Sequence, residues 1–273
     1  MMRANPESIW AVPVYLPCVQ PALTAEAVGA AEAKIGQRLP EAYLRLLRAQ
    51  NGGYVRFTLP GTLHDSLAGI GPHYPSLTEF SWDEDRPFVS FELDGLVPFN
   101  GDGHWWLCLD YRGGRREPVV TLADVEEGRE EQVAESFEAF VGMLRLRVTD
   151  QFLLVGVADA DEVKRRLSEK CGVRFAAMDE QIGGFAKDLG RLTTAGARHS
   201  FALYPNTVRR GFVRREDERY AELKDVMPEM DDQFPGLPPA SWLVSVGPES
   251  AHAVTGAFAK VGVVMRPLGE VIG

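Results

Sequence analysis

The residue types best suited to chemistry lie close together in one segment, where His64, Asp65 and His73 could bind a metal ion. Metal sites usually show a spacing such as H-x-x-H, H-E-x-x-H or paired cysteines, and none accompanies these residues. The sequence also has no G-x-S-x-G nucleophile elbow, no G-x-x-x-x-G-K-S/T phosphate loop and no G-x-G-x-x-G motif after a strand. We therefore expect no metal, no cofactor, no catalytic residue and no enzymatic activity. An enzyme with an unrecognised site is the least favoured alternative.

A second candidate metal site, the Asn100 to Gly103 segment, resembles part of a calcium-binding loop. Such a loop needs glycine at its sixth position and carboxylates at its first and twelfth positions. Placing Gly103 sixth puts Pro98 first and Leu109 twelfth, which excludes calcium binding. A glycine-rich turn between two strands explains the segment, and it would present Asp102 and His104 at the surface for a partner.

Acidic residues surround the long segment between Pro60 and Pro87, which has few periodic cues and is expected to be a functional or covering loop. A run of charged residues is usually a solvated face. The alternative is a patch that meets a basic partner. On that hypothesis the partner-binding residues are Trp82, Asp83, Glu84, Asp85, Glu92, Asp94, Asp102, His104 and Trp106.

Trp105 and Trp106 are expected to point to opposite faces of a strand, because neighbouring side chains of a strand alternate. Trp105 then shares one face with Leu107, and Trp106 shares the other with Cys108 and Asp110. One tryptophan should lie in the core, and the other either beneath a helix or partly exposed at an interface. Asp110 is expected to accept structural hydrogen bonds at the strand end rather than to bind a partner.

One basic concentration stands out in the second half of the sequence. Its arginines are interleaved with, and followed by, acidic residues, so the charges nearly cancel. We expect an exposed, salt-bridged surface, and an anion-binding role is the less favoured alternative. The arginines are Arg209, Arg210, Arg214, Arg215 and Arg219.

The 273-residue chain is acidic, with 39 Asp and Glu against 29 Lys and Arg. Residues 1–150 carry a net charge of −9 and residues 151–273 a net charge of −1. A generic nucleic-acid surface needs clustered Lys and Arg, whereas the acidic first half would attract a basic partner. The sequence has no run of about 18 apolar residues and no secretion signal, and its three scattered cysteines favour a reducing compartment. We expect a cytoplasmic protein with a protein partner, no direct nucleic acid and no membrane.

The elements that must position these residues follow from the hydrophobic periodicity of the first half. Two helices are expected between Leu23 and Gln50, the first ending at Gly36 and the second at the Asn51-Gly52-Gly53 turn. Two helices followed by several strands and a closing helix predict an α+β domain in which helices pack on a mixed, largely antiparallel sheet. The expected strands are 54–59, 88–93, 96–99, 105–111 and 118–122, and the expected closing helix is 133–144.

The second half repeats a strand, helix, strand order twice. Asp159 is the expected N-cap of the first helix and Gly172 its stop. We predict two domains, residues 1–150 and 151–273, the second being a smaller α/β-type domain with a ferredoxin-like arrangement as one candidate. The first repeat is expected at 152–157, 161–171 and 173–177, and the second at 242–246, 250–261 and 263–265.

Three segments of the first half resemble, in order, the motifs of the SUKH superfamily, which includes the Smi-one/Knr-four-like proteins of bacteria and fungi. The first is IGQRLPEAYLRLL at 35–47 followed by NGG at 51–53. The second is LVPFNGDGHWWLCLDYR at 96–112, and the third is VAESFEAF at 133–140. The resemblance covers roughly residues 20–146 and says nothing about residues 150–273.

The resemblance implies binding rather than turnover. SUKH proteins include immunity proteins that neutralise co-encoded toxins, many of them nucleases or deaminases, and fungal regulatory proteins. The first expectation is therefore a non-catalytic module that binds and occludes a cognate toxin. The alternative is a cytosolic regulatory or scaffolding protein whose partner is not a toxin.

Overall fold

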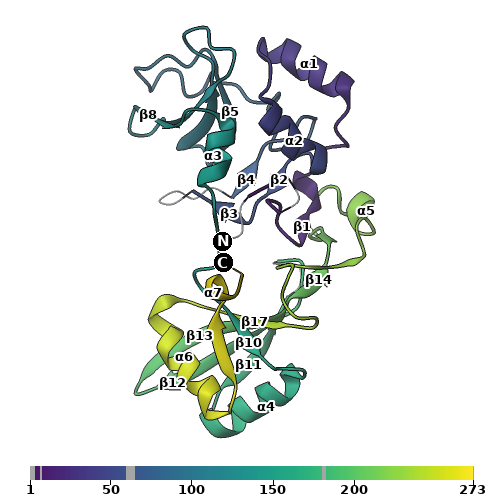
Figure 1. Ribbon diagram of the computed structural model, residues 1–273, viewed down its shortest axis with the longest axis vertical. Helices are drawn as coiled ribbons and strands as arrows, with labels where there is room; N and C mark the ends of the chain where they lie inside the picture. The colour runs from purple at the N-terminus through teal and green to yellow at the C-terminus, as the bar shows by residue number, and fades with distance from the viewer. Residues whose placement is uncertain (1–3, 7, 60–64, 180–182, 273) are drawn as a thin grey trace. The chain divides into compact units, whose positions relative to one another are not determined.

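The computed structural model describes residues 4–6, 8–59, 65–179 and 183–272 (Figure 1). The described residues up to 147 form one compact unit, and those from 148 onward form another. Both units contain helices packed on antiparallel sheet, and the α+β class predicted from the sequence is confirmed. His64 falls outside the described residues.

The first unit begins with short elements and a helix pair whose ends are set by local chemistry. The Thr24 hydroxyl accepts a hydrogen bond from the amide of Ala27, and Gly36 ends the first helix in the left-handed conformation, as expected. The second helix starts after Pro40, and the side chains of its Tyr43 and of three of its leucines are buried. The elements are β1 (Val14–Tyr15), a 3-10 turn η1 (Leu16–Cys18), α1 (Ala25–Ile35) and α2 (Glu41–Ala49).

A four-stranded antiparallel sheet in the order β5-β6-β7-β8 forms the centre of this unit. One side of it holds a buried aromatic cluster in which the Phe137 ring centroid lies 4.7 Å from that of Tyr43 and 5.4 Å from that of Phe99. The elements are β5 (Leu96–Gly101), β6 (Trp105–Asp110), β7 (Val119–Asp124), β8 (Arg129–Ala134) and α3 (Phe137–Met143). Two short pairs complete the unit, β2 (Gly53–Tyr54) with β4 (Ser66–Leu67) and β3 (Phe57–Thr58) with β9 (Arg145–Leu146).

Two expectations for this unit are wrong in detail. Residues 88–93 do not form a strand; the alternating apolar residues there belong to an irregular segment that lays every second side chain onto the sheet without pairing its backbone. The closing helix begins only after the Ser136 cap, because Val133 and Ala134 belong to edge strand β8. Glu130 and Glu131 therefore lie on this strand.

The second unit is built on one six-stranded sheet in the order β11-β12-β13-β17-β10-β18, and every neighbouring pair is antiparallel. Its helix α4 is capped by Asp159 and ends at a left-handed Gly172, as the sequence predicts. The strands are β10 (Gln151–Val155), β11 (Arg174–Met178), β12 (Lys187–Thr194), β13 (Ala197–Pro205), β17 (Trp242–Val246) and β18 (Val264–Pro267). The other elements are α4 (Ala160–Cys171), β14 (Thr207–Arg209), β15 (Gly211–Phe212), α5 (Tyr220–Leu223), β16 (Met230–Asp232), α6 (Pro248–Lys260) and α7 (Leu268–Ile272).

Helices α4 and α6 pack on one face of this sheet and share a single apolar core with it. Strands β17 and β18 run parallel with β10 between them, which is the split β-α-β arrangement of ferredoxin-like folds. The β10-α4-β11 unit departs from that pattern because β12, β13 and β17 all separate its two strands. All neighbouring strands of this sheet are antiparallel, whereas an α/β domain is built on a parallel sheet. The α/β expectation therefore holds only for the order of strands and helices along the chain.

Candidate functional site

The side of the first unit's sheet that faces away from the helices is covered by residues 80–93. Cys108 and Ala123 point to this side, and Trp82, Leu93 and Leu96 pack on them in a closed apolar cluster. Burial raises the pKa of the Cys108 thiol well above its usual value, so this cysteine is not a ready nucleophile. The long loop predicted from the sequence therefore has a covering role in its second part.

Three aromatic rings fix the covering segment to the sheet. The Phe80 ring centroid lies 4.7 Å from that of Trp82 and 4.6 Å from that of Trp106, both edge to face. The indole Nε1 of Trp82 donates a hydrogen bond to the carbonyl of Leu96 at 3.0 Å. Trp82 is thus buried and holds the segment from beneath, so its side chain is not at the surface where the predicted partner-binding residues would meet a partner. Trp106 is half-buried in the same cluster.

The acidic residues of this segment remain at the surface. Asp83 and Glu84 are exposed in the turn that follows Trp82, and Glu92 is exposed further along. No salt bridge joins these three carboxylates to a basic side chain within the described part of the chain. The sequence-predicted acidic patch is therefore a surface feature.

Two other acidic residues of the segment are more constrained. Asp94 accepts a 2.8 Å hydrogen bond from Arg86, which ties the turn to the end of the segment. Partial burial, and then the neighbouring Glu84 charge, raise the pKa of Asp85. Because Asp94 pairs with Arg86 and the pKa of Asp85 is raised, these two residues contribute less negative charge to the patch than their number suggests.

Sequence reasoning missed two exposed aromatic residues. Phe88 is 76% exposed within the covering segment, and Tyr74 is 75% exposed in the preceding loop. Large exposed aromatic side chains are typical anchors of protein interfaces. Phe88 belongs to the strand expected at 88–93, and the irregular path that the segment takes instead turns its side chain outward.

The predicted turn residues lie at the tip of the β5–β6 hairpin. The Asp102 carboxylate accepts hydrogen bonds from the amides of His104, at 2.9 Å, and Trp105, at 3.2 Å. His104 Nδ1 lies 3.3 Å from a carboxylate oxygen of Glu126. Both Asp102 and His104 are exposed, but they belong to a different loop from the acidic segment, and Asp102 has a structural task in the turn.

Asp110 forms the core of a polar network at the other end of β6. Its carboxylate accepts hydrogen bonds from the backbone amide, Nε and Nη2 of Arg112 and from the hydroxyl of Thr121. Burial alone would raise the pKa of Asp110, yet these hydrogen bonds outweigh it and the pKa is lowered. Arg112 also pairs with Glu130 at 2.7 Å, and the resulting polar hollow of about 590 Å³ includes Glu92. The expected structural role of Asp110 is confirmed.

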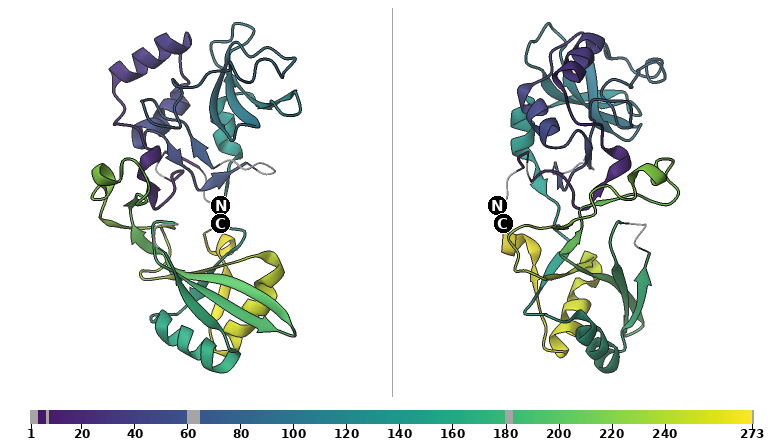
Figure 2. Two further views of the ribbon diagram at one scale, coloured as in Figure 1. Left: turned by 180° about the vertical axis from the view of Figure 1, so that it is seen from behind. Right: turned by 90° about the vertical axis from the view of Figure 1, so that its right-hand side faces the viewer.

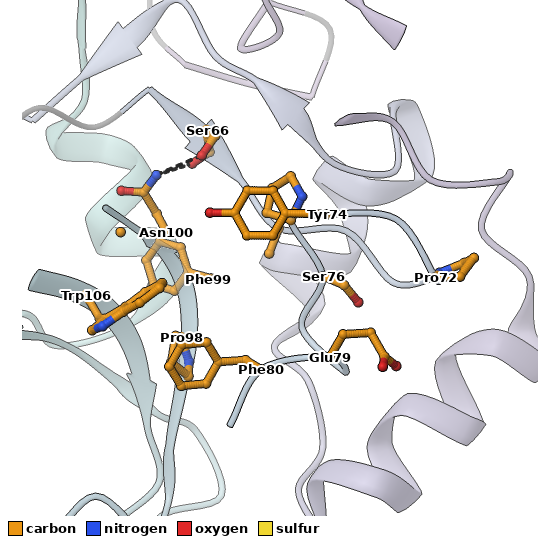
Figure 3. Close-up of a pocket in the computed structure, with 13 residues that line it drawn as sticks. Ser66, Pro72, Tyr74, Ser76, Glu79, Phe80, Pro98, Phe99, Asn100 and Trp106 are labelled. Carbon is orange, nitrogen blue, oxygen red and sulfur yellow. Dashed lines mark hydrogen bonds between the residues drawn. The ribbon is translucent and has the colours of Figure 1, made fainter. Parts of the chain in front are cut away.

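A smaller cavity of about 150 Å³ lies between the loop that bears Tyr74 and strands β5 and β6 (Figure 3). Asn100 donates from Nδ2 to the backbone oxygen and the hydroxyl of Ser66, at 2.9 and 3.0 Å. Asn100 Oδ1 and Trp106 Nε1 are buried and have no hydrogen-bond partner among the described residues. Both residues line the cavity, whose wall is mainly apolar and which has room for one small side chain or ligand group.

Two further properties of the described residues bear on the site. No group of three or more His, Cys, Asp or Glu side chains among them is arranged to hold a metal ion. None of their helices is both long and apolar enough to cross a lipid bilayer.

Comparison with known proteins identifies the first unit. Residues 22–143 match the model of the SMI1 / KNR4 family (SUKH-1). No curated protein and no solved structure matches the chain. The matched residues agree with the resemblance carried by the three sequence motifs, and the N-terminal half of the chain therefore contains a domain of this family.

Proposed function

We propose that this SUKH-1 domain binds a basic protein surface through residues 83–94 and occludes it, as an immunity protein occludes a toxin. SUKH-1 proteins are in general immunity-type protein-binding modules, which supports the binding class. The observation that carries the proposal is the exposed Phe88 among the unpaired carboxylates of Asp83, Glu84 and Glu92. An aromatic anchor surrounded by charge is a common composition for a specific interface.

Electrostatics supports a basic partner. The net charge of −9 in residues 1–150 attracts a basic protein over a distance of about a Debye length, roughly 8 Å at physiological salt. Arg86 lies near Asp83 and Arg112 donates to the Glu92 backbone oxygen, but within the described residues neither arginine forms a salt bridge with these carboxylates, so their charge faces solvent. Complementary charge of this kind raises the association rate and the specificity more than the final affinity.

Rigidity supports the same role. The contacts among Phe80, Trp82 and Trp106, together with the Trp82 to Leu96 hydrogen bond, hold the irregular segment in one conformation before a partner arrives. A segment that is already ordered loses little conformational entropy when the partner binds. Trp82 therefore contributes to binding by positioning the patch.

The cellular setting and the kind of partner are part of the proposal. Cys18, Cys108 and Cys171 form no disulfide bond in the described part of the chain, which supports a reducing, cytoplasmic environment. A co-encoded basic toxin, such as a nuclease or deaminase, is the favoured partner, and non-catalytic blocking is the favoured action. A regulatory partner that is not a toxin is the outcome to expect if no toxin gene accompanies this one.

The test uses the full chain and a partner identified by co-purification and mass spectrometry. A variant that combines Asp83→Asn, Glu84→Gln and Glu92→Gln should slow association about tenfold at low salt and less at high salt. The Phe88→Ala variant should mainly speed dissociation. The matched control combines Glu26→Gln, Glu117→Gln and Glu135→Gln, which removes the same charge from other exposed positions.

Equal effects of the two triple variants would show that only net charge matters and would refute a binding patch at 83–94. Unchanged dissociation in Phe88→Ala would refute the anchor. A partner whose contact surface is acidic would overturn the proposal as a whole.

A further inference from the structure

Three arginines that are distant in the sequence meet on the sheet of the second unit. Arg174 on β11 lies directly opposite Arg191 on β12, and Arg198 on β13 pairs with Thr193, two residues along from Arg191. Residues paired across antiparallel strands, and residues two apart on one strand, share a face. The three guanidinium groups therefore project from one side of the β11–β13 region.

That side is the one the helices leave open. Phe175, Leu192 and Phe201, which alternate with the arginines along the same strands, belong to or pack on the core under α4 and α6. Arg174, Arg191 and Arg198 are all exposed. Figure 2 (left) shows these strands, in green, from the face turned away from α6.

The cluster is uncompensated. Like charges directly opposite each other on a sheet are destabilising, yet none of the three arginines forms a salt bridge within the described part of the chain. The arginine-rich segment predicted from the sequence behaves differently, because Arg219 pairs with Glu222 at 2.7 Å and Arg210 with Glu229 at 3.5 Å. The unit can neutralise its arginines with carboxylates and does not do so here.

The arginines surround a hollow of about 880 Å³. Its lining includes the hydroxyl-bearing residues Thr193 and Ser200, which share the arginine face, and contains no carboxylate among the residues that the structure describes. Guanidinium groups bind phosphate oxygens with two parallel hydrogen bonds, and hydroxyl groups can donate more. The hollow has the chemistry of an anion site.

We propose that this hollow binds a compact polyphosphate group, such as the phosphates of a nucleotide. Three strands span about 10 Å, so the positive patch is little wider than a Debye length. A long nucleic-acid strand would extend beyond it over a protein of net charge −10. The two aromatic residues in the lining, Phe175 and His199, are half-buried and belong to the helix-covered face of the strands. They therefore offer no open platform for stacked bases, which single-strand binding surfaces use. This proposal is independent of the one for the SUKH-1 domain.

The test is calorimetric titration of the full chain with inorganic triphosphate, with a nucleoside triphosphate and with a single-stranded oligonucleotide. Triphosphate should bind with one site per chain. Each of Arg174→Gln, Arg191→Gln and Arg198→Gln should weaken that binding about tenfold. Arg266→Gln is the matched control, because Arg266 is exposed on the same face at the opposite edge of the sheet, where it pairs with Leu153, and it should leave binding unchanged.

Tighter binding of the nucleoside triphosphate would assign a nucleotide as the ligand, and equal binding would assign the phosphate chain alone; both support the site. Absence of triphosphate binding would overturn the proposal. So would an equal loss in Arg266→Gln, or an oligonucleotide that binds more tightly than triphosphate through the same three arginines.

Discussion

Single residues gain their roles here from the groups they face. Trp82, Asp94 and Asp110 could each bind a partner chemically, but each is already engaged within the protein. Trp82 donates to a backbone carbonyl, Asp94 pairs with an arginine, and Asp110 belongs to a polar network. Asp83, Glu84 and Phe88 sit beside them in the sequence and remain free at the surface. Residue type and spacing place Asp83, Glu84 and Glu92 on a solvated face, and they are exposed. Which aromatic ring of the segment is buried, Trp82 or Phe88, is decided by packing.

Asp110 permits a pH-dependent prediction at this scale. Its pKa is lowered in the folded protein, so its contribution to stability is present above the unfolded pKa of about 4 and is lost as pH falls through the folded value. Asp110→Asn should lower the free energy of unfolding by about 2 kcal/mol at neutral pH, because Arg112 and Thr121 lose a charged acceptor. The difference from wild type should shrink as the pH is brought below 4, measured by urea unfolding across the pH range. Glu117→Gln, at an exposed carboxylate, is the control, and a deficit that stayed constant with pH would contradict the assigned cause.

A close contact at one glycine shapes the β5–β6 hairpin of the first unit. Strand β5 has a register irregularity between Pro98 and Asn100 and ends at Gly101, which lies against the Trp106 ring. A Cβ at Gly101 would come within 2.3 Å of that ring and 2.5 Å of the Trp105 carbonyl oxygen. The glycine therefore allows the hairpin to bring Trp106 into the cavity wall and the aromatic cluster.

Gly101→Ala should destabilise the hairpin by about 1–3 kcal/mol, the usual cost of overpacking, and should change Trp106 fluorescence. Gly29→Ala is the matched substitution, since Gly29 lies inside α1 with nothing near its missing Cβ. It should stabilise the protein by up to about 1 kcal/mol. Thermal unfolding of both variants checks the pair, and equal shifts of the same sign would refute the steric argument.

At the scale of the whole molecule, two apolar clusters each stay within one half of the chain. The apolar cluster under α4 and α6, with the side chains packed on it, is made of residues from 152 onward, and the cluster beneath the covering segment is made of residues before 126. We propose on this basis that residues 1–150 and 151–273 are two domains, the first carrying the protein-binding role and the second the polyphosphate site.

Separate expression of residues 1–147 and 148–273 tests this division. Each fragment should unfold in a single cooperative transition with the secondary structure content of the corresponding part of the full chain, measured by circular dichroism. The first fragment should retain partner binding, and the second should retain triphosphate binding. A fragment that shows no cooperative transition would contradict the two-domain proposal.

The sequence alone determined what depends on near neighbours. Helix caps at Asp159 and Gly172, the alternation of Trp105 and Trp106, the two strand-helix-strand repeats and the SUKH motifs all rest on spacings of a few residues, and local geometry enforces them. Tertiary structure alone decided which side of the covering segment is buried, and it alone placed Arg174, Arg191 and Arg198 together. Strand register is set by backbone hydrogen bonds between segments far apart in the chain, and no local pattern encodes which arginine will lie opposite which.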